Sequence, residues 1–316
     1  MTIFIPCSRK RLTRGVLYFA FAYLKKNLGA PAFAAGKNMQ WILRTLLITA
    51  LFAARLPDSS PALSGIAHVA FRVSDVAKSR EFYRALGFEE SFEFADPGKP
   101  PVSYIKISDH QFVELYGRAD NGQPTGLMHV YYEAADIESL WNEYTKRGLN
   151  PPPARKARAG NLLFLFHDPE NQILEYTQYL PGSLHFEDRG KHLSQRRIAQ
   201  HLKRAAMVVQ DLPAEFAFFT SKLAFEEIMG ATPRRLRIPG SSGDEVELEL
   251  ATATTKPRIV FSVVNLASTA AELRKRSFTV MESTDSVSIS DPDGMQIIFE
   301  LENAAPKTSR GPRERE

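Results

Sequence analysis

One pattern recurs along the 316-residue chain: a strand, a helix and three further strands, repeated about every 55 residues. The first copy opens with IAHVAFRVSD at residues 66–75, and the second opens with GLMHVYYEAAD at residues 126–136. In both copies the strand stops at an acidic residue, and a segment with helical spacing of apolar residues follows. The repeat predicts an α+β fold in which tandem βαβββ units form curled, mixed β-sheets.

Two fainter copies follow in the second half of the chain. Residues 202–227 repeat the strand, the acidic stop and the helix, and residues 258–278 repeat the opening of the second unit. We therefore predict two domains of two units each, joined by a polar linker and followed by a disordered tail. Their expected bounds are 64–180 for the first domain, 181–198 for the linker, 199–303 for the second domain and 304–316 for the tail.

The N-terminal extension, residues 1–62, carries nine Lys or Arg residues and a single acidic residue. The rest of the chain is therefore mildly acidic despite a formal net charge of +4. No run of basic residues with interleaved aromatic residues occurs in the predicted domains, so we expect no nucleic-acid partner. Cys7 is the only cysteine, which excludes a disulfide within the chain.

Residues 39–62 have the organisation of a secretory signal. Arg44 precedes an apolar run at 45–54, and Ser60, Pro61 and Ala62 form a small-x-small cleavage site. The apolar run is too short to span a bilayer, so we expect export to the periplasm or the medium and no stable membrane span. A cytoplasmic protein with an amphipathic anchor or an unstructured extension is the alternative.

Residue alternation places polar side chains on one face of the first predicted sheet. In the first strand His68 and Arg72 share a face. The opposite face is apolar and must cover the helix, so both polar side chains are expected on the concave side. The same count predicts that His129 points inward with Tyr131, and that Met128 points toward the helix.

Two carboxylates are predicted to face the same concave side, because Glu114 and Glu175 lie in the last strands of the two units. Two imidazoles and two carboxylates suit one divalent metal ion such as Ni, Co, Mn, Fe or Zn. Without a cation, two buried carboxylates facing each other are costly. We therefore predict a metal site formed by His68, Glu114, His129 and Glu175.

The second predicted domain lacks these ligands. Arg204 and Arg258 stand at the positions that correspond to His68 and His129, and no histidine follows His201. Ile298 stands where the last carboxylate is expected. We therefore predict that the second domain keeps the fold and binds no metal.

The paired units, with HVAFRVSDVAKSREFYRALGFEE at 68–90 and DPENQILEY at 168–176, resemble the vicinal oxygen chelate superfamily across residues 64–303. That superfamily includes glyoxalase I, methylmalonyl-CoA epimerase, extradiol dioxygenases and bleomycin or fosfomycin resistance proteins. The resemblance implies two domains with curled mixed sheets. It does not select one reaction, since the scaffold carries several chemistries.

The resemblance implies a glyoxalase-like or epimerase-like enzyme that removes a proton next to a carbonyl of a small oxygenated substrate. Glu175 would be the base and Glu114 its counterpart, with His68 and His129 as fixed ligands. Further substrate-binding candidates are Arg72, whose guanidinium suits a carboxylate, Tyr116, Tyr131 and Arg118. Arg118 stands where the glyoxalase pattern has a side-chain amide, which argues against glutathione.

Two other functions stay open. An Fe(II) extradiol dioxygenase would use His68, His129 and Glu175, but Glu114 would crowd its metal, and Leu165 stands where such enzymes keep a tyrosine. A non-catalytic binding or resistance protein would stack an aromatic ligand in a cleft of inward-facing rings. The candidate rings are Tyr104, Phe112, Tyr116, Tyr131 and Phe164 or Phe166. The cleft could close within one chain or across a homodimer.

Overall fold

The computed structural model describes residues 63–302, all within one compact unit of the chain. The predicted signal at 39–62 and the predicted tail at 304–316 lie outside the described residues. The division into two domains at the linker stays a prediction. No helix within residues 63–302 combines the length and the apolar character needed to cross a bilayer.

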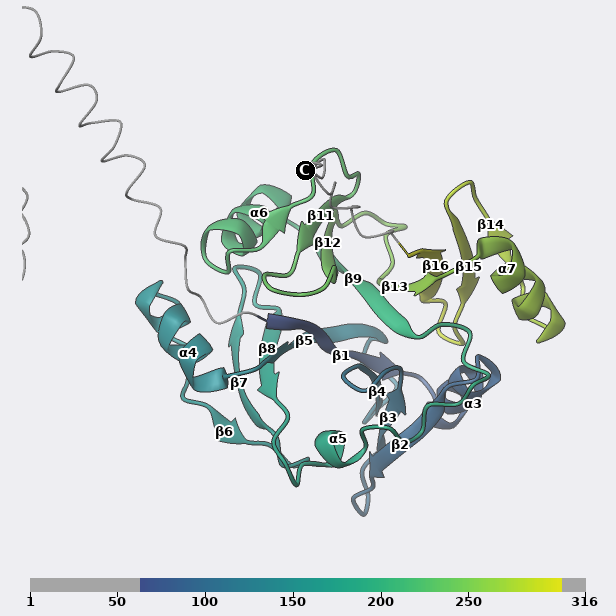
Figure 1. The fold of residues 1–316 in the computed structure, drawn as a ribbon, viewed down its shortest axis with the longest axis horizontal. Coiled ribbons are helices and arrows are strands. Elements are labelled where there is room, and N and C mark those ends of the chain that lie inside the picture. Colours follow the sequence, from purple (N-terminus) through teal and green to yellow (C-terminus); the bar gives the residue numbers. More distant parts are fainter. Residues whose placement is uncertain (1–62, 303–316) are drawn as a thin grey trace, which may run out of the picture. The chain divides into compact units, whose positions relative to one another are not determined.

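The first sheet contains eight strands in the order β2-β3-β4-β1-β5-β8-β7-β6 (Figure 1). Its elements, in chain order, are β1 (Leu63–Val73), α3 (Val76–Ala85), β2 (Glu89–Phe94), β3 (Val102–Lys106), β4 (Phe112–Gly117), β5 (Gly126–Ala134), α4 (Ile137–Lys146), β6 (Arg155–Lys156), β7 (Leu162–His167) and β8 (Ile173–Gln178). The two predicted units meet where β1 pairs with β5 in antiparallel fashion. Within each unit the first and last strands are parallel neighbours, which makes the sheet mixed.

The second sheet repeats this order as β10-β11-β12-β9-β13-β16-β15-β14. Its elements are β9 (His201–Val209), α6 (Leu212–Ser221), β10 (Glu226–Glu227), β11 (Arg234–Arg237), β12 (Glu245–Leu250), β13 (Arg258–Val263), α7 (Leu266–Lys275), β14 (Met281–Glu282), β15 (Ser286–Ser290) and β16 (Gln296–Leu301). The segment between the sheets contains one short helix, α5 (Leu184–Glu187). The predicted α+β fold with tandem βαβββ units is confirmed.

The residue two positions after each opening strand is the N-cap of the helix that follows. The side chains of Asp75, Asp136, Asp211 and Asn265 each accept a hydrogen bond from a backbone N–H in the first turn of α3, α4, α6 or α7. Such a cap satisfies donors that have no partner within the helix. The acidic stop of the repeat is therefore the signal that turns each strand into a helix.

The two faces of the first sheet pack differently. Apolar residues such as Val69 and Val130 join the main hydrophobic core, whereas Ala70 and Tyr131 belong to a separate cluster on the concave face. The prediction that Met128 faces the helix is wrong, because Met128 packs with the concave cluster. A register shift between β1 and β5 at this level explains the difference, since it breaks the simple alternation of side chains.

Buried hydrogen bonds join the first sheet to the second. The side-chain amide of Gln111 donates to the backbone oxygen of Leu202 and accepts from its backbone N–H, each at 2.8 Å. The backbone N–H of Ile66 donates to Asp244 Oδ2 at 2.8 Å. These contacts satisfy polar groups at an interior junction, where an unpaired group would be costly.

Candidate metal and active site

Four neighbouring strands of the first sheet carry the predicted ligands. Ala70 of β1 lies opposite Glu114 of β4 on one side and opposite His129 of β5 on the other. On β8, Glu175 lies opposite Tyr131. All four predicted ligands are buried. The concave face of β4-β1-β5-β8 therefore gathers two imidazoles and two carboxyl groups, as the alternation predicts.

His68 and Glu114 form the closest pair of this group, with 3.8 Å between Nδ1 and Oε2. On its other side, His68 Nε2 lies 2.7 Å from the hydroxyl of Tyr179. The other oxygen of Glu114, Oε1, accepts hydrogen bonds from the hydroxyls of Tyr104 and Tyr116. Charge-assisted hydrogen bonds of this kind favour an ionised carboxylate.

The two carboxyl groups have opposite pKa shifts. Burial raises the pKa of Glu114, but its contacts with His68 and Tyr104 outweigh burial, so the pKa lies below its usual value. Burial, together with the negative charge of Glu114, raises the pKa of Glu175 to about 8. Near neutral pH one carboxyl is therefore ionised and the other holds its proton. Two neighbouring carboxyls with separated pKa values can act as an acid and a base.

His129 is the second inward imidazole, and burial lowers its pKa to about 4. Its ring lies 4.7 Å from the ring of Tyr131, which in turn lies 4.6 Å from the ring of His68. Neither nitrogen of His129 has a hydrogen-bond partner among the described residues. A buried neutral imidazole with two unpaired nitrogens is suited to a metal ion or a substrate.

The donor set fits a divalent metal ion. His68 Nδ1, Glu114 Oε2 and both nitrogens of His129 are buried without a hydrogen-bond partner within residues 63–302. Metal–ligand bonds of about 2.1 Å allow two ligands of one ion to lie up to roughly 4.2 Å apart, and the pair of His68 and Glu114 falls within this range. However, no group of three or more His, Cys, Asp or Glu residues in the described part is arranged to hold a metal. The four-ligand site stays a prediction.

The substrate-binding candidates differ in position. Tyr131 and Tyr116 line the concave face beside the ligands. Arg72 is partly exposed at the end of β1, where its guanidinium makes only a long contact of 3.5 Å to the backbone oxygen of Pro124. Arg118 lies in the turn after β4 and donates to the backbone oxygen of Asn121. Arg72 therefore stands at the open end of the concave face, and Arg118 is engaged by its own turn.

The aromatic lining was predicted in part. Tyr104 and Phe112 belong to the concave cluster. The expectation that Phe164 or Phe166 lines the cleft is wrong, since both pack in the main core. Alternation accounts for this outcome, because the partner of Glu175 on β7 is Leu165, so its two neighbours point the other way.

Two residues near the ligands were missed in the sequence. Tyr179 lies four residues after Glu175 and shares its face, so alternation could have found it. His185, in α5, could not be found this way, because nothing in the linker sequence shows that a four-residue helix returns to the concave face. Its ring lies 4.5 Å from that of His68, and neither of its nitrogens has a partner among the described residues. Figure 1 shows α5 inside the curve of the first sheet.

The second sheet has different residues at the same register positions. Arg204 and Arg258 replace the two histidines, and Ile298 replaces Glu175. Glu247 replaces Glu114 and lies 2.9 Å from the Nε atom of Arg204. Arg258 also pairs with Glu247. Internal ion pairs therefore occupy these positions, and the expectation that this half binds no metal stays a prediction.

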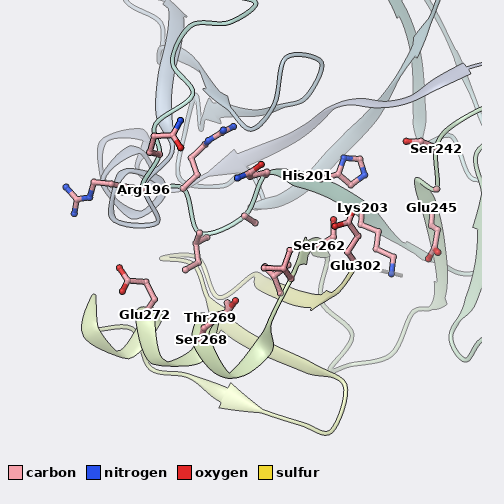
Figure 2. Close-up of a pocket in the computed structure, with 18 of the residues that line it drawn as sticks. Arg196, His201, Lys203, Ser242, Glu245, Ser262, Ser268, Thr269, Glu272 and Glu302 are labelled. Atoms are coloured by element: carbon pink, nitrogen blue, oxygen red, sulfur yellow. The ribbon is translucent and has the colours of Figure 1, made fainter. Parts of the chain in front are cut away.

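A cavity of about 1170 Å³ lies beside the second sheet (Figure 2). Its wall carries charges of both signs, including Arg196, Lys203, Glu245 and Glu272. Lys203 is paired with Glu300, and part of the basic charge is therefore neutralised. The cavity contains none of the predicted ligands, so we do not place the active site there.

Comparisons with known proteins agree on the fold. The model of the Glyoxalase/Bleomycin resistance protein/Dioxygenase superfamily matches residues 65–176. Similar solved structures include homoprotocatechuate 2,3-dioxygenase from Arthrobacter globiformis, with 17% identity, a TM-score of 0.57 and coverage of 78% of this chain and 83% of that chain. The Mn(II)-bound glyoxalase from Novosphingobium aromaticivorans has 16% identity, a TM-score of 0.58 and coverage of 76% and 83%.

The 2,3-dioxygenase LapB from Pseudomonas sp. KL28 is a third similar structure, with 13% identity and a TM-score of 0.58. The alignment covers 80% of this chain and 97% of that chain. No curated protein matches the sequence. At these identities the likeness concerns the fold and does not decide between the reactions.

Proposed function

Because residues 65–176 belong to the glyoxalase/bleomycin resistance protein/dioxygenase superfamily, we propose that the first sheet is a metal-dependent enzyme site for proton transfer next to a carbonyl. One observation carries the proposal. The buried carboxyls of Glu114 on β4 and Glu175 on β8 face one concave side of the sheet, where His68 and His129 keep unpaired ring nitrogens. A binding protein would gain little from two buried carboxyls, whereas a proton-transfer site needs an acid and a base.

The metal would be held by His68, Glu114, His129 and Glu175, and when bound it would polarise the substrate carbonyl and stabilise negative charge on its oxygen. The hydroxyls of Tyr104 and Tyr116 hold Glu114 as an anion. Burial and the charge of Glu114 raise the pKa of Glu175 and outweigh the opposing hydrogen bond from Tyr131, so the carboxyl of Glu175 is the group that exchanges a proton with substrate. A divalent ion would oppose this rise in pKa and favour the ionised form of Glu175.

Arg72 is the residue that would bind an acidic part of the substrate. It lies at the end of β1 that is partly open to solvent, while His68 on the same strand is fully buried. A guanidinium at the mouth of a buried site suits a carboxylate through paired hydrogen bonds. The substrate class is therefore a small oxygenated compound with a carbonyl group and an acidic group.

An extradiol dioxygenase is the second candidate, and one observation favours it. Flat rings surround His68, with Tyr131, Phe112 and His185 at centroid distances of 4.6, 5.5 and 4.5 Å. Such a lining would suit a catechol ring. Two of the similar structures are 2,3-dioxygenases. Against this reaction, Glu114 adds a second carboxylate to the three ligands that such an iron site uses.

The test begins with metal analysis of the full chain purified without a histidine tag. We expect about one divalent ion per chain in the wild type, loss of that ion in H129Q, and no change in the matched variant R258Q of the second sheet. Equal metal content in wild type and H129Q would refute the site.

The reaction is then tested by two assays on the loaded chain. Proton transfer predicts exchange of solvent deuterium next to the carbonyl of small α-oxo or acyl substrates, and loss of this exchange in E175Q. Oxygen uptake with catechols, without deuterium exchange, would instead support the dioxygenase. If the metal-loaded chain shows neither activity, a binding protein is the remaining candidate.

We also propose that residues 39–62 direct export. The supporting observation is the short apolar run at 45–54 before the small-x-small sequence. N-terminal sequencing of the protein recovered from an expressing cell tests it, since cleavage near Ala62 is expected, and an intact N-terminus would contradict it.

A further inference from the structure

The four predicted ligands of the first sheet are closed off from solvent, with exposed fractions of 0 to 9%. A substrate reaches them only if one boundary of the concave face opens. Much of that boundary is backbone, since all eight strands, from β2 at one edge to β6 at the other, are hydrogen-bonded in one sheet. The linker is anchored by Asp188, which lies 2.8 Å from the Nζ atom of the fully buried Lys106. The seam between the two edge strands is the part of the boundary that only side chains close.

One ion pair joins the two edges of the first sheet, which lie on either side of α5 in Figure 1. The guanidinium of Arg158, two residues after β6, donates a hydrogen bond of 2.9 Å from each Nη atom to the carboxylate of Asp96, two residues after β2. It also lies over the ring of Phe94, the last residue of β2, with Cζ 4.2 Å from the ring centroid. The ion pair therefore connects the edges around the site.

The ion pair belongs to the same end of the concave face as Arg72. Across β2, β3, β4 and β1, the register places Phe94 level with Tyr116 and Arg72. The ring of Phe94 packs edge-on against the ring of Tyr104, with centroids 5.7 Å apart, and the hydroxyl of Tyr104 donates to Glu114. A continuous series of contacts thus runs from the ion pair to a predicted ligand.

The ion pair is weak enough to open. The side chains of Asp96 and Arg158 are 41% and 54% exposed, and an exposed ion pair contributes little to stability. The β6–β7 hairpin is held on its other side by the linker, because the backbone N–H of Leu184 donates to the backbone oxygen of Ala159 at 2.8 Å. The β2–β3 hairpin, with its tip at residues 95–101, is therefore the side that we expect to move.

The second sheet has no such contact between its edges. Within residues 63–302, no hydrogen bond or ion pair connects β10 or the turn after it with β14 or the turn after it. The comparable exposed pair, Arg274 with Glu282, connects β14 to α7 of the same unit. In the described part of the chain, the contact between edges is therefore confined to the half that carries the predicted ligands.

We propose that the ion pair of Asp96 and Arg158 is the gate of the concave site. When the pair is formed, the seam is shut and water is kept from the buried carboxyls and imidazoles. When the pair separates, the β2–β3 hairpin moves away and the substrate enters beside Arg72. The inference rests on the proposed function, which makes the concave face the place of reaction.

The test measures access to the concave face in the metal-free full chain. The parent chain carries C7S, which removes the natural thiol, and A70C, which places a thiol on the concave face. Ala70 is fully buried and lies opposite two predicted ligands in the register. The rate at which dithiodipyridine, a neutral reagent, modifies this thiol reports the opening of the site. We expect D96N to raise the rate about 5-fold, and R158Q to act in the same way.

Three controls separate a gate from a general loosening of the fold. E282Q breaks an exposed ion pair of the second half and should leave the rate of A70C unchanged. A206C places a buried thiol at the corresponding position of the second sheet, and its rate should be the same with and without D96N. Salt at about 1 M screens exposed charges, so it should speed the modification of A70C in the parent chain and have little effect in D96N.

The outcomes separate this inference from the proposed function. An A70C rate that neither D96N nor R158Q changes would overturn the gate, and so would an equal increase in E282Q. Metal content is measured separately on the wild type. A wild type without metal would refute the proposed function, and the thiol rates would still show whether the ion pair controls access to the concave face.

Discussion

The two sheets share one strand order and one register, and they differ in how charge is balanced at four positions. In the first sheet His68, Glu114 and His129 leave buried nitrogen and oxygen atoms unpaired, and the pKa of the buried Glu175 is raised. In the second sheet Arg204 and Arg258 neutralise Glu247, and Ile298 replaces the last carboxyl. The fold is therefore compatible with both an internal ion-pair network and a site that needs an external cation.

The comparison shows what the change from histidine to arginine does. A guanidinium keeps its charge at all physiological pH values and carries five donors in a rigid fork. The guanidinium of Arg204 forms ion pairs with Glu245, Glu247 and Glu300. A neutral imidazole cannot neutralise a carboxylate in this way. The second sheet thus carries its cations in its own side chains, whereas in the first sheet we propose that a metal takes that role.

The largest expected effect is on stability and concerns the buried network of the second sheet. We expect R204M to lower the free energy of unfolding by about 3 to 5 kcal/mol, because three carboxylates lose a buried partner. The corresponding variant of the first sheet, H68L, should change the stability of the metal-free chain by about 1 kcal/mol or less, since it loses one hydrogen bond and one unpaired nitrogen.

Urea unfolding at pH 7 without metal measures both variants. Equal destabilisation by R204M and H68L would break the comparison, because it would show that the histidine of the first sheet is as strongly paired as the arginine of the second.

A smaller effect concerns a carboxyl of the second half that has no guanidinium. Glu215 of α6 is fully buried, and burial together with Asp168 raises its pKa to about 7. Its folded pKa exceeds its unfolded value, so the folded state binds more protons between pH 4.5 and 7, and stability falls as the pH rises through this window. Asp168, Glu170 and Asp211 are the other charged groups facing it.

We expect E215Q to lose this pH dependence and to be more stable than wild type at pH 8 by on the order of 2 kcal/mol. Thermal unfolding at pH 4.5, 6 and 8 provides the measurement. Parallel curves for the two proteins would show that the buried carboxyl is neutralised by some other means, as Glu247 is.

The smallest expected effect concerns the hydroxyls that replace guanidiniums around Glu114. We expect Y116F to destabilise the metal-free chain by on the order of 1 kcal/mol, because Tyr104 still donates to the same oxygen. The control is Y83F, which removes a buried hydroxyl that has no hydrogen-bond partner within residues 63–302. A loss as large as that in R204M would mean that a single hydroxyl balances Glu114 as strongly as an arginine balances Glu247.

Most of the fold could be predicted from the sequence because the repeat encodes it locally. The acidic stop is visible in the sequence and acts as a helix cap, and period-two alternation separates the concave face from the core. The same rule failed for Met128, where the register shift between β1 and β5 is set by strand pairing and leaves no local signal. The prediction for Phe164 and Phe166 was wrong although alternation is regular there, because Leu165 pairs with Glu175 and its two neighbours therefore face the main core.

The candidate site was predictable as far as it lies on strands. His68, Glu114, His129 and Glu175 follow from alternation, and their neighbours Tyr116 and Tyr131 follow with them. His185 did not, because its place depends on the path of the linker, which is fixed by tertiary contacts such as that between Lys106 and Asp188. The ligand atoms of each histidine also depend on hydrogen bonds across the fold, which a sequence does not display.

The side-chain amide of Gln111 makes two hydrogen bonds with the backbone of Leu202, as a neighbouring strand would. The carboxylate of Asp244 accepts from the backbone N–H of Ile66, two residues before His68. An isolated first half would expose Gln111 and the backbone N–H of Ile66 to solvent, close to the predicted metal ligands. We therefore expect the first half to lose stability when it is separated from the second. We expect a shortened chain that keeps the first sheet to need the second half, or replacements for its three partner groups.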